Sequence, residues 1–318
     1  RPCYLQQASE HTWVVPDGTS LRLSPFGYQN TPQGGIYVNY NSVTHYGHSL
    51  LMATCTPSID FAAIKTVEQG GREQLNDSLI QIENEYYNTI RPKPVMQANT
   101  MPALSLLHKG VDYVEVRLFD LNPYEPLGVN QDQLAFCDVF LTWCLLKDEQ
   151  RLSDADMTRI SGNVKQVLIN GHHPKKSLTQ SNGKQVCIPE ALECMMAELE
   201  PVAHWMDEHA KEPIYAKAFR AQQQKIAQPD TLPAKRVLKQ LESQSYQNMM
   251  ANLGEDFKAR YTNKTLASEV EHTFVKAALE SKKQQQALEE ENKDLSFEDF
   301  YRQYRAQAAT FFTHKVPV

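Results

Sequence analysis

Long apolar runs and an excess of positive charge are both missing from this sequence of 318 residues. No stretch reaches the roughly 18 consecutive apolar residues that a membrane-spanning helix requires. The 32 Lys and Arg residues stand against 38 Asp and Glu residues, for a net charge of -6. This balance argues against nucleic-acid binding through bulk charge, although it does not exclude a local basic groove. We therefore expect a soluble, cytoplasmic protein with neither a membrane nor a nucleic acid as partner.

Four familiar motifs of catalysis and nucleotide binding are also absent. The sequence contains no GxGxxG, GxxxxGKS/T, HExxH or GxSxG pattern, which would mark dinucleotide folds, phosphate loops, zinc proteases and serine hydrolases. Nucleotide use therefore cannot be inferred from a glycine-rich loop. His45 and His48 have helical spacing and could hold a metal ion, but an isolated pair of histidines is more often incidental.

The six cysteines form no CxxC motif. Two pairs of them are seven residues apart, Cys137 with Cys144 and Cys187 with Cys194, and this spacing is helical. We expect them to be small buried side chains in a reducing compartment.

The first third of the chain carries the strand signals. Pro16-Asp17-Gly18 is a turn sequence between two apolar runs and predicts a hairpin over residues 12–24. Alternating patterns predict strands near residues 79–90 and 112–119. Short helices are expected at 41–54 and 102–110, the second ending at Gly110.

Helical periodicity dominates after residue 129. Asn130 and Ser153 are plausible N-caps, and Ser296 begins a weak capping pattern before a final helix. The helix that Asn130 begins is apolar around most of its circumference, so we expect it to be buried. Further helices are expected over 188–210, 233–252 and 266–292, the last with a solvated charged face, and a polar loop over 171–185. Strands followed by helices indicate an α+β fold. We divide it into a β-rich region, 1–128, and a helical region, 129–318, that packs on it.

Polar side chains gather on one face of the three strand candidates. The set comprises Arg22, Glu83, Glu85, Tyr87, Tyr113, Glu115 and Arg117. If the strands share one sheet, its opposite face is packed by alternating Leu, Ile and Val side chains. Carboxylates and arginines placed together suit Mg²⁺ and phosphate groups, but a solvated sheet face is equally polar. Spacing alone leaves both interpretations open.

At these residues the sequence resembles a known family. "TSLRLSPFGYQN", "LIQIENEYYNTIRPKP", "GVDYVEVRLFDLNPYEPLGV" and "FLTWCLL" are similar to successive blocks of bacterial glutamate–cysteine ligases, in family order, and the likeness continues in "RISGNVKQVLINGHHP". The resemblance implies a glutamine-synthetase-like antiparallel catalytic sheet, here partial. It also implies Mg²⁺-dependent joining of L-glutamate to L-cysteine through an acyl phosphate formed from ATP, the first step of glutathione biosynthesis.

The resemblance also implies roles for individual residues. Glu115 is similar to a Mg²⁺ ligand, and Arg117 to the catalytic arginine that steadies the transferring phosphoryl group. The residues that resemble the pocket for the cysteine substrate are Arg22, Tyr28 and Tyr87. Arg91 lies in a matching motif and is expected at the ATP phosphates, whereas Glu83 and Glu85 have no assigned role.

Members of the family carry a sizeable segment before the block that begins at Arg1, and this segment supplies further acidic metal ligands and part of the glutamate site. Arg1-Pro2-Cys3 is neither an initiator Met nor a signal sequence. We therefore expect the C-terminal portion of a ligase, inactive by itself, whose partner is the missing N-terminal segment. Two alternatives remain: a related ligase that uses another amine, and a non-catalytic truncated homologue that binds a partner.

Overall fold

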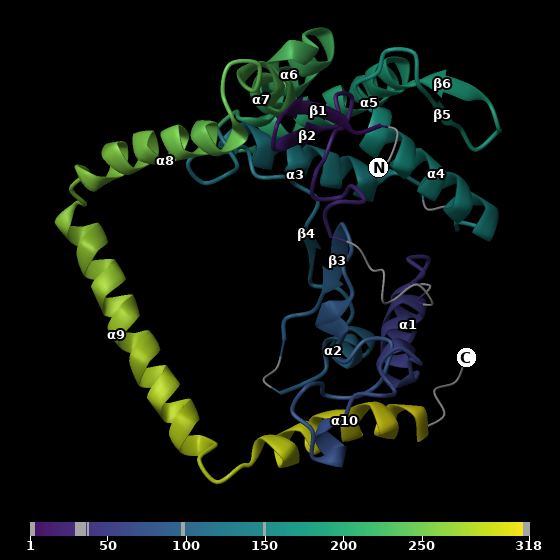
Figure 1. Cartoon of the computed structure of the whole chain (residues 1–318), viewed down its shortest axis with the longest axis vertical. Coiled ribbons are helices and arrows are strands. Elements are labelled where there is room, and N and C mark those ends of the chain that lie inside the picture. The colour runs from purple at the N-terminus through teal and green to yellow at the C-terminus, as the bar shows by residue number, and fades with distance from the viewer. Residues whose placement is uncertain (1–3, 29–35, 37, 97–98, 149–150, 314–318) are drawn as a thin grey trace. The chain divides into compact units, whose positions relative to one another are not determined.

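The computed structural model describes residues 4–28, 36, 38–96, 99–148 and 151–313. The chain divides into two compact units: Arg1–Tyr28 with Phe119–Asn263, and Gln29–Leu118 with Lys264–Val318. Helices and short antiparallel strands occur in the described residues (Figure 1), which confirms the α+β prediction. The predicted boundary between residues 128 and 129 divides the chain into a β-rich region and a helical region. This division stays a prediction.

The unit built on Phe119–Asn263 has a helical core. Its helices are α3 (Gln131–Leu146), α4 (Asp154–Asn170), α5 (Ile188–His209), α6 (Tyr215–Ala227), α7 (Pro233–Gln240) and α8 (Tyr246–Thr262), with a 3₁₀ turn η4 (Pro229–Thr231). Val139 of α3, Leu199 of α5 and Phe219 of α6 are almost fully buried and form its centre. Two hairpins, β1 (Gln6–Ser9) with β2 (Thr12–Val14) and β5 (Ser177–Thr179) with β6 (Gln185–Cys187), complete the unit.

The unit built on Gln29–Leu118 contains the β3–β4 pair. Its elements are α1 (Val43–Cys55), the 3₁₀ turns η2 (Val67–Gln69) and η3 (Glu83–Glu85), β3 (Ile90–Lys93), α2 (Pro102–Lys109), β4 (Tyr113–Val116), α9 (Ser268–Glu291) and α10 (Phe297–Thr313). Leu51, Ile80 and Leu106 are large, fully buried side chains of its core. α10 joins this core, since Ala308 is buried in it and the Asn76 amide donates to the Tyr301 hydroxyl at 2.7 Å.

Most predicted helices are confirmed. Side chains of Asn130 and Ser153 accept main-chain N–H groups at the starts of α3 and α4, and Ser296 does the same before α10. Gly110 ends α2 with a φ of 83°, a conformation that favours glycine. The predicted helix 233–252 is instead split into α7 and α8. α9 has no buried residue, which includes the charged face that was predicted to be solvated.

Two of the three strand candidates are wrong. Residues 20–24 form turns, and β2 pairs with β1 rather than with them. Ser20 and Ser24 explain the turns, because their hydroxyls bond to the main chain of Leu23 and Leu21 and compete with strand pairing. The three segments therefore do not share one sheet.

The segment before Tyr87 folds in the same local way. The Asn76 side chain accepts the N–H of Ser78, and the Glu85 carboxylate accepts the N–H of Gln81. The N–H groups of Leu79 and Ile80 donate to the carbonyls of Thr56 and Ala53 at the end of α1, so these bonds replace the pairing of a predicted strand. The chain then turns through η3 instead of extending, so the predicted alternation of faces is lost.

Three smaller expectations also fail. None of the five described cysteines is buried, although burial was predicted for them. The predicted polar loop 171–185 contains the strand β5 and the start of β6. α3 was expected to be buried around most of its circumference, but Leu145 and Leu146 are exposed. Within the described part of the chain, no helix combines the length and apolar character that crossing a membrane demands.

Candidate active site

The candidate site is built on two paired strands, β3 and β4, which lie side by side (Figure 1). Their antiparallel register sets Arg91 directly opposite Glu115. The ladder continues one step further, because the N–H of Arg117 donates to the carbonyl of Thr89 at 2.8 Å. The strand predicted for the Glu115–Arg117 motif is thus confirmed over Tyr113–Val116.

Glu115 and Arg117 form an ion pair. The Arg117 Nε donates to Glu115 Oε1 at 2.7 Å, and the Lys93 ammonium lies 3.6 Å from the other carboxylate oxygen. The hydrogen bond from Arg117 lowers the pKa of Glu115, so the carboxylate is charged at neutral pH. Both side chains are about one-third exposed, which leaves them accessible to a ligand.

The described residues do not complete a Mg²⁺ site. No group of three or more His, Cys, Asp or Glu side chains within them is arranged to hold a metal ion. Glu115 offers a single carboxylate, and both of its oxygens face cationic side chains. His45 bonds to Ser42 at the start of α1, and His48 packs edge-on against Phe311, so this pair has separate structural contacts.

Tyr87 lies beside the Glu115–Arg117 pair. Its hydroxyl donates to the carbonyl oxygen of Arg117 at 3.1 Å, and its side chain is half-buried. The phenol is therefore held at the end of β4, next to the predicted phosphate-binding arginine. This proximity was not readable from the sequence pattern, because Tyr87 follows the turn η3 rather than a strand.

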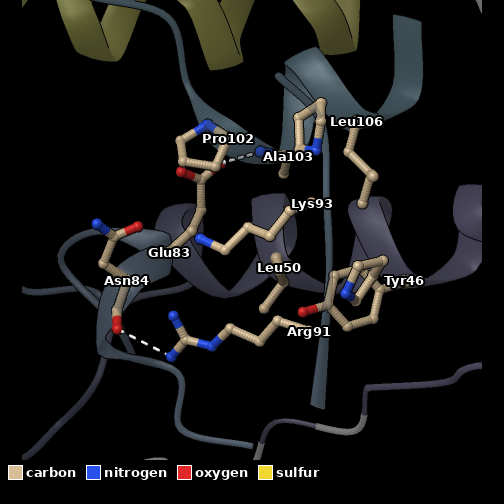
Figure 2. Close-up of a pocket in the computed structure, with 11 residues that line it drawn as sticks. Tyr46, Leu50, Glu83, Asn84, Arg91, Lys93, Pro102, Ala103 and Leu106 are labelled. Carbon is tan, nitrogen blue, oxygen red and sulfur yellow. Dashed lines mark hydrogen bonds between the residues drawn. The ribbon is translucent and has the colours of Figure 1, made fainter. Parts of the chain in front are cut away.

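Arg91 is almost fully buried, with 5% of its surface exposed. Its Nη2 atom donates to the main-chain carbonyls of Tyr86 and Asn84, the latter at 3.1 Å. Figure 2 shows the guanidinium turned toward Asn84. The expected contact of Arg91 with ATP phosphates stays a prediction.

Glu83 is the residue whose importance the sequence did not reveal. It is 4% exposed, and its carboxylate accepts the N–H of Ala103 at 3.0 Å, in the first turn of α2 (Figure 2). The Tyr304 hydroxyl of α10 donates to its second oxygen at 3.5 Å. Burial raises the pKa of Glu83 to about 7. Glu83 thus joins η3, α2 and α10, whereas Glu85 is exposed.

Arg22 and Tyr28 belong to the other unit and lie together there. The Arg22 guanidinium sits 4.9 Å from the centre of the Tyr28 ring, and the N–H of Tyr28 donates to the Arg22 carbonyl at 2.9 Å. Asp120 fixes this turn by accepting the N–H of Arg22 at 2.8 Å. Gly27 is required, because a Cβ would collide with the Arg22 carbonyl. The Tyr28 side chain is 60% exposed.

The three residues predicted for the cysteine pocket therefore belong to two different units. Arg22 and Tyr28 contact each other in one unit, and Tyr87 contacts Arg117 in the other. Their combination into a single cysteine pocket stays a prediction.

The comparisons with known proteins agree on one family. Residues 2–167 match the family described as "Glutamate-cysteine ligase". Proteins named glutamate–cysteine ligase from Azotobacter vinelandii and Pseudomonas aeruginosa are 35% and 33% identical to the chain, with 96% of it covered in each case. The chain spans 58% of the length of each of these curated relatives.

A solved structure is similar throughout the chain. The glutamate–cysteine ligase of Francisella tularensis, in complex with AMP, matches with a TM-score of 0.86 and 27% identity. The match covers 97% of this chain and 61% of that one. A bifunctional glutathione synthetase from Pasteurella multocida, at 22% identity and a TM-score of 0.51, shares the fold over 76% of the chain. On the family match and these likenesses, the chain belongs to the glutamate–cysteine ligase family.

Proposed function

We propose that the chain forms part of an ATP-dependent ligase that joins the γ-carboxylate of L-glutamate to the amine of L-cysteine. The observation that carries the proposal is the pair of Glu115 on β4 and Arg117 directly after it, with Tyr87 bonded to the Arg117 carbonyl. The names of the relatives and their AMP-bound structural neighbour support it. Because the chain spans 58% of its curated relatives, the activity is assigned to the whole protein.

The reaction must gather negative charge and then redistribute it. Phosphorylation of the glutamate γ-carboxylate by ATP gives an acyl phosphate, and the cysteine amine displaces the phosphate. Arg117 suits the transferring phosphoryl group, because its guanidinium offers several donors in a fixed plane. Glu115 is proposed as one ligand of Mg²⁺, with the remaining ligands supplied by residues other than those described.

Arg22, Tyr28 and Tyr87 are proposed to bind the cysteine substrate. A guanidinium recognises the α-carboxylate of an amino acid, and phenol hydroxyls orient it by hydrogen bonds. Arg22 and Tyr28 form a preassembled pair for this purpose, since their turn is fixed by Asp120.

A further polypeptide segment is proposed as the partner that completes the site. Val114 and Leu118 belong to the apolar face of the Glu115 strand, yet they are 43% and 38% exposed. Among the described residues β4 pairs with β3, and apolar side chains exposed beside an open strand edge are a surface that a further segment can cover. The part of the relatives that lies outside the match would supply that surface, whether or not it is continuous with this chain. A cytoplasmic location accompanies this proposal.

The test is ADP release from ATP with both amino acids present. It is run on the chain alone and on the chain combined with the unmatched part of the Azotobacter vinelandii relative. We expect release that requires both L-glutamate and L-cysteine. Release with another amine in place of cysteine would indicate a related ligase. Binding of the added segment without ADP release, whatever the amine, would indicate a non-catalytic module and contradict the proposal.

A further inference from the structure

The guanidinium of Arg91 binds the main chain immediately before Tyr87. Its Nη2 atom bonds to the carbonyls of Asn84 and Tyr86, and Tyr86 immediately precedes Tyr87. A single side chain thus fixes two successive parts of the turn η3. Because Arg91 is itself anchored in the β3–β4 ladder opposite Glu115, it ties this turn to the strand that bears Glu115.

The space beside Arg91 is small. The cavity that Arg91, Glu83 and Tyr46 line has a volume of about 20 Å³ (Figure 2), which suffices for about one water molecule. The guanidinium also forms none of the ion pairs among the described residues. Main-chain oxygens bind its Nη2 atom, and the nearby Glu115 carboxylate also stabilises its charge.

Neighbouring phenols do not neutralise Arg91. Burial raises the pKa of Tyr46 to about 12, so its hydroxyl is neutral at physiological pH. Burial, and secondly the charge of Arg117, lowers the pKa of Arg91. The Glu115 carboxylate on the facing strand opposes this effect, and a buried cation also depends strongly on its hydrogen bonds. The bonds to Asn84 and Tyr86 are thus expected to be stiff restraints on the turn.

Tyr87 is consequently held at both ends. On its N-terminal side Arg91 holds the carbonyl of Tyr86, and at the tip of its ring the hydroxyl bonds to the Arg117 carbonyl. Loss of the first restraint frees the backbone from which the phenol projects. The second restraint alone then has to define the position of the ring.

We propose that Arg91 is a positioning residue that sets the affinity for the amino-acid substrate by holding Tyr87 beside Arg117. The substrate named in this inference depends on the proposed function, whereas the contacts of Arg91 and Tyr87 do not. It assigns Arg91 to the architecture of the cysteine pocket, in place of the contact with ATP phosphates that its motif suggested.

The kinetic test uses Arg91→Lys in the preparation that releases ADP. Lysine keeps the charge but lacks the planar fork that reaches two carbonyls at once. We expect the KM for L-cysteine to rise by about tenfold, as for one charged hydrogen bond, with the KM for ATP unchanged. Arg72→Lys is the matched control, because Arg72 is exposed in the same unit. A raised KM for ATP with an unchanged KM for cysteine would overturn the proposal.

A double-mutant cycle shows whether Arg91 acts through Tyr87. Tyr87→Phe removes the hydroxyl that bonds to the Arg117 carbonyl. If Arg91 works by placing this hydroxyl, Arg91→Lys adds little to the KM for cysteine in the Tyr87→Phe background. Fully additive effects of the two substitutions would contradict the proposal.

A spectroscopic test needs no activity and so separates this inference from the proposed function. 3-Fluorotyrosine is placed at Tyr87, and its ¹⁹F resonance is compared between the parent chain and the Arg91→Lys variant. We expect a changed chemical shift and a broader line, while 3-fluorotyrosine at Tyr215 in the other unit is unaffected. Far-UV circular dichroism verifies that the variant is folded. An unchanged Tyr87 resonance in the folded variant would overturn the proposal even if the ligase activity is established.

Discussion

The Glu83 carboxylate accepts the main-chain N–H of Ala103 at 3.0 Å. Ala103 lies in the first turn of α2, where N–H groups have no partner within the helix. The residue before α2, Met101, provides no side-chain cap. A carboxylate twenty residues earlier in the chain therefore takes the place of the usual capping side chain.

The raised pKa of Glu83 predicts a pH-dependent stability. Burial moves this pKa from 4.5 to about 7, so between these values the folded state binds the proton more tightly than the unfolded state. The free energy of unfolding therefore falls as the pH rises from 4.5 to 7, by at most about 3 kcal/mol. Glu83→Gln keeps an acceptor for Ala103 and removes the charge. Urea unfolding at pH 5 and pH 8 should show a smaller difference in the variant; an equal difference would exclude Glu83 as the cause.

Substitutions of Glu115 and Arg117 distinguish a catalytic role of this ion pair from a structural one. In the active preparation, Glu115→Gln should raise the Mg²⁺ concentration needed for half-maximal activity. Arg117→Lys should lower kcat by about tenfold or more, because the planar fork is lost where phosphoryl charge develops. The partly exposed pair itself contributes only about 0.5–1 kcal/mol. Variants with normal kinetics and a lowered melting temperature would instead assign the pair a structural role.

Tyr28→Phe tests the proposed substrate role of the turn at Arg22. Phenylalanine preserves the ring under the Arg22 guanidinium and removes only the hydroxyl. We expect the KM for L-cysteine to rise about fivefold, within the range of one hydrogen bond, without a change in the KM for ATP. Tyr124→Phe is a matched control, since Tyr124 lies under Arg236 in the same unit. A KM for cysteine that Tyr28→Phe leaves unaltered would remove Tyr28 from the pocket.

The bond between Asn76 and Tyr301 should hold α10 in place. Tyr301→Phe removes the hydroxyl that accepts from the buried Asn76 amide at 2.7 Å, and a buried polar group that loses a partner costs about 1–3 kcal/mol. Amide hydrogen exchange should therefore accelerate in α10. Tyr246→Phe, at an exposed tyrosine of the other unit, should leave this exchange unchanged. Unaltered exchange in Tyr301→Phe would show that apolar packing alone secures the helix.

The sequence predicts features that depend on neighbouring residues and misses those that depend on distant ones. Asn130 and Ser153 were recognised as caps because each acts three residues along the chain. The strand predicted before Tyr87 failed because Asn76 and Glu85 bond to the main chain nearby, a choice that alternation of side chains does not reveal.

The candidate site shows the same division. The pairing of Glu115 with Arg117 follows from their spacing of two residues on one face of a strand. The sequence pattern around Glu83 does not predict its bond to Ala103 or its bond to Tyr304, which is 221 residues away. Likewise, the burial of Arg91 follows from the turn of the chain at η3, which was not predicted.

Gln29–Leu118 and Lys264–Val318 belong to one unit, although much of the other unit lies between them in the sequence. This arrangement has a consequence for the synthesis of the protein. Asn76 and Tyr301 are separated by 225 residues, so a ribosome must translate all the residues between them before their bond can form. Closing so long a loop also carries an entropic cost that slows folding. Until α10 emerges, the apolar surface that Ala308 covers lacks this helix, and exposed apolar surface of this kind generally favours aggregation of folding intermediates.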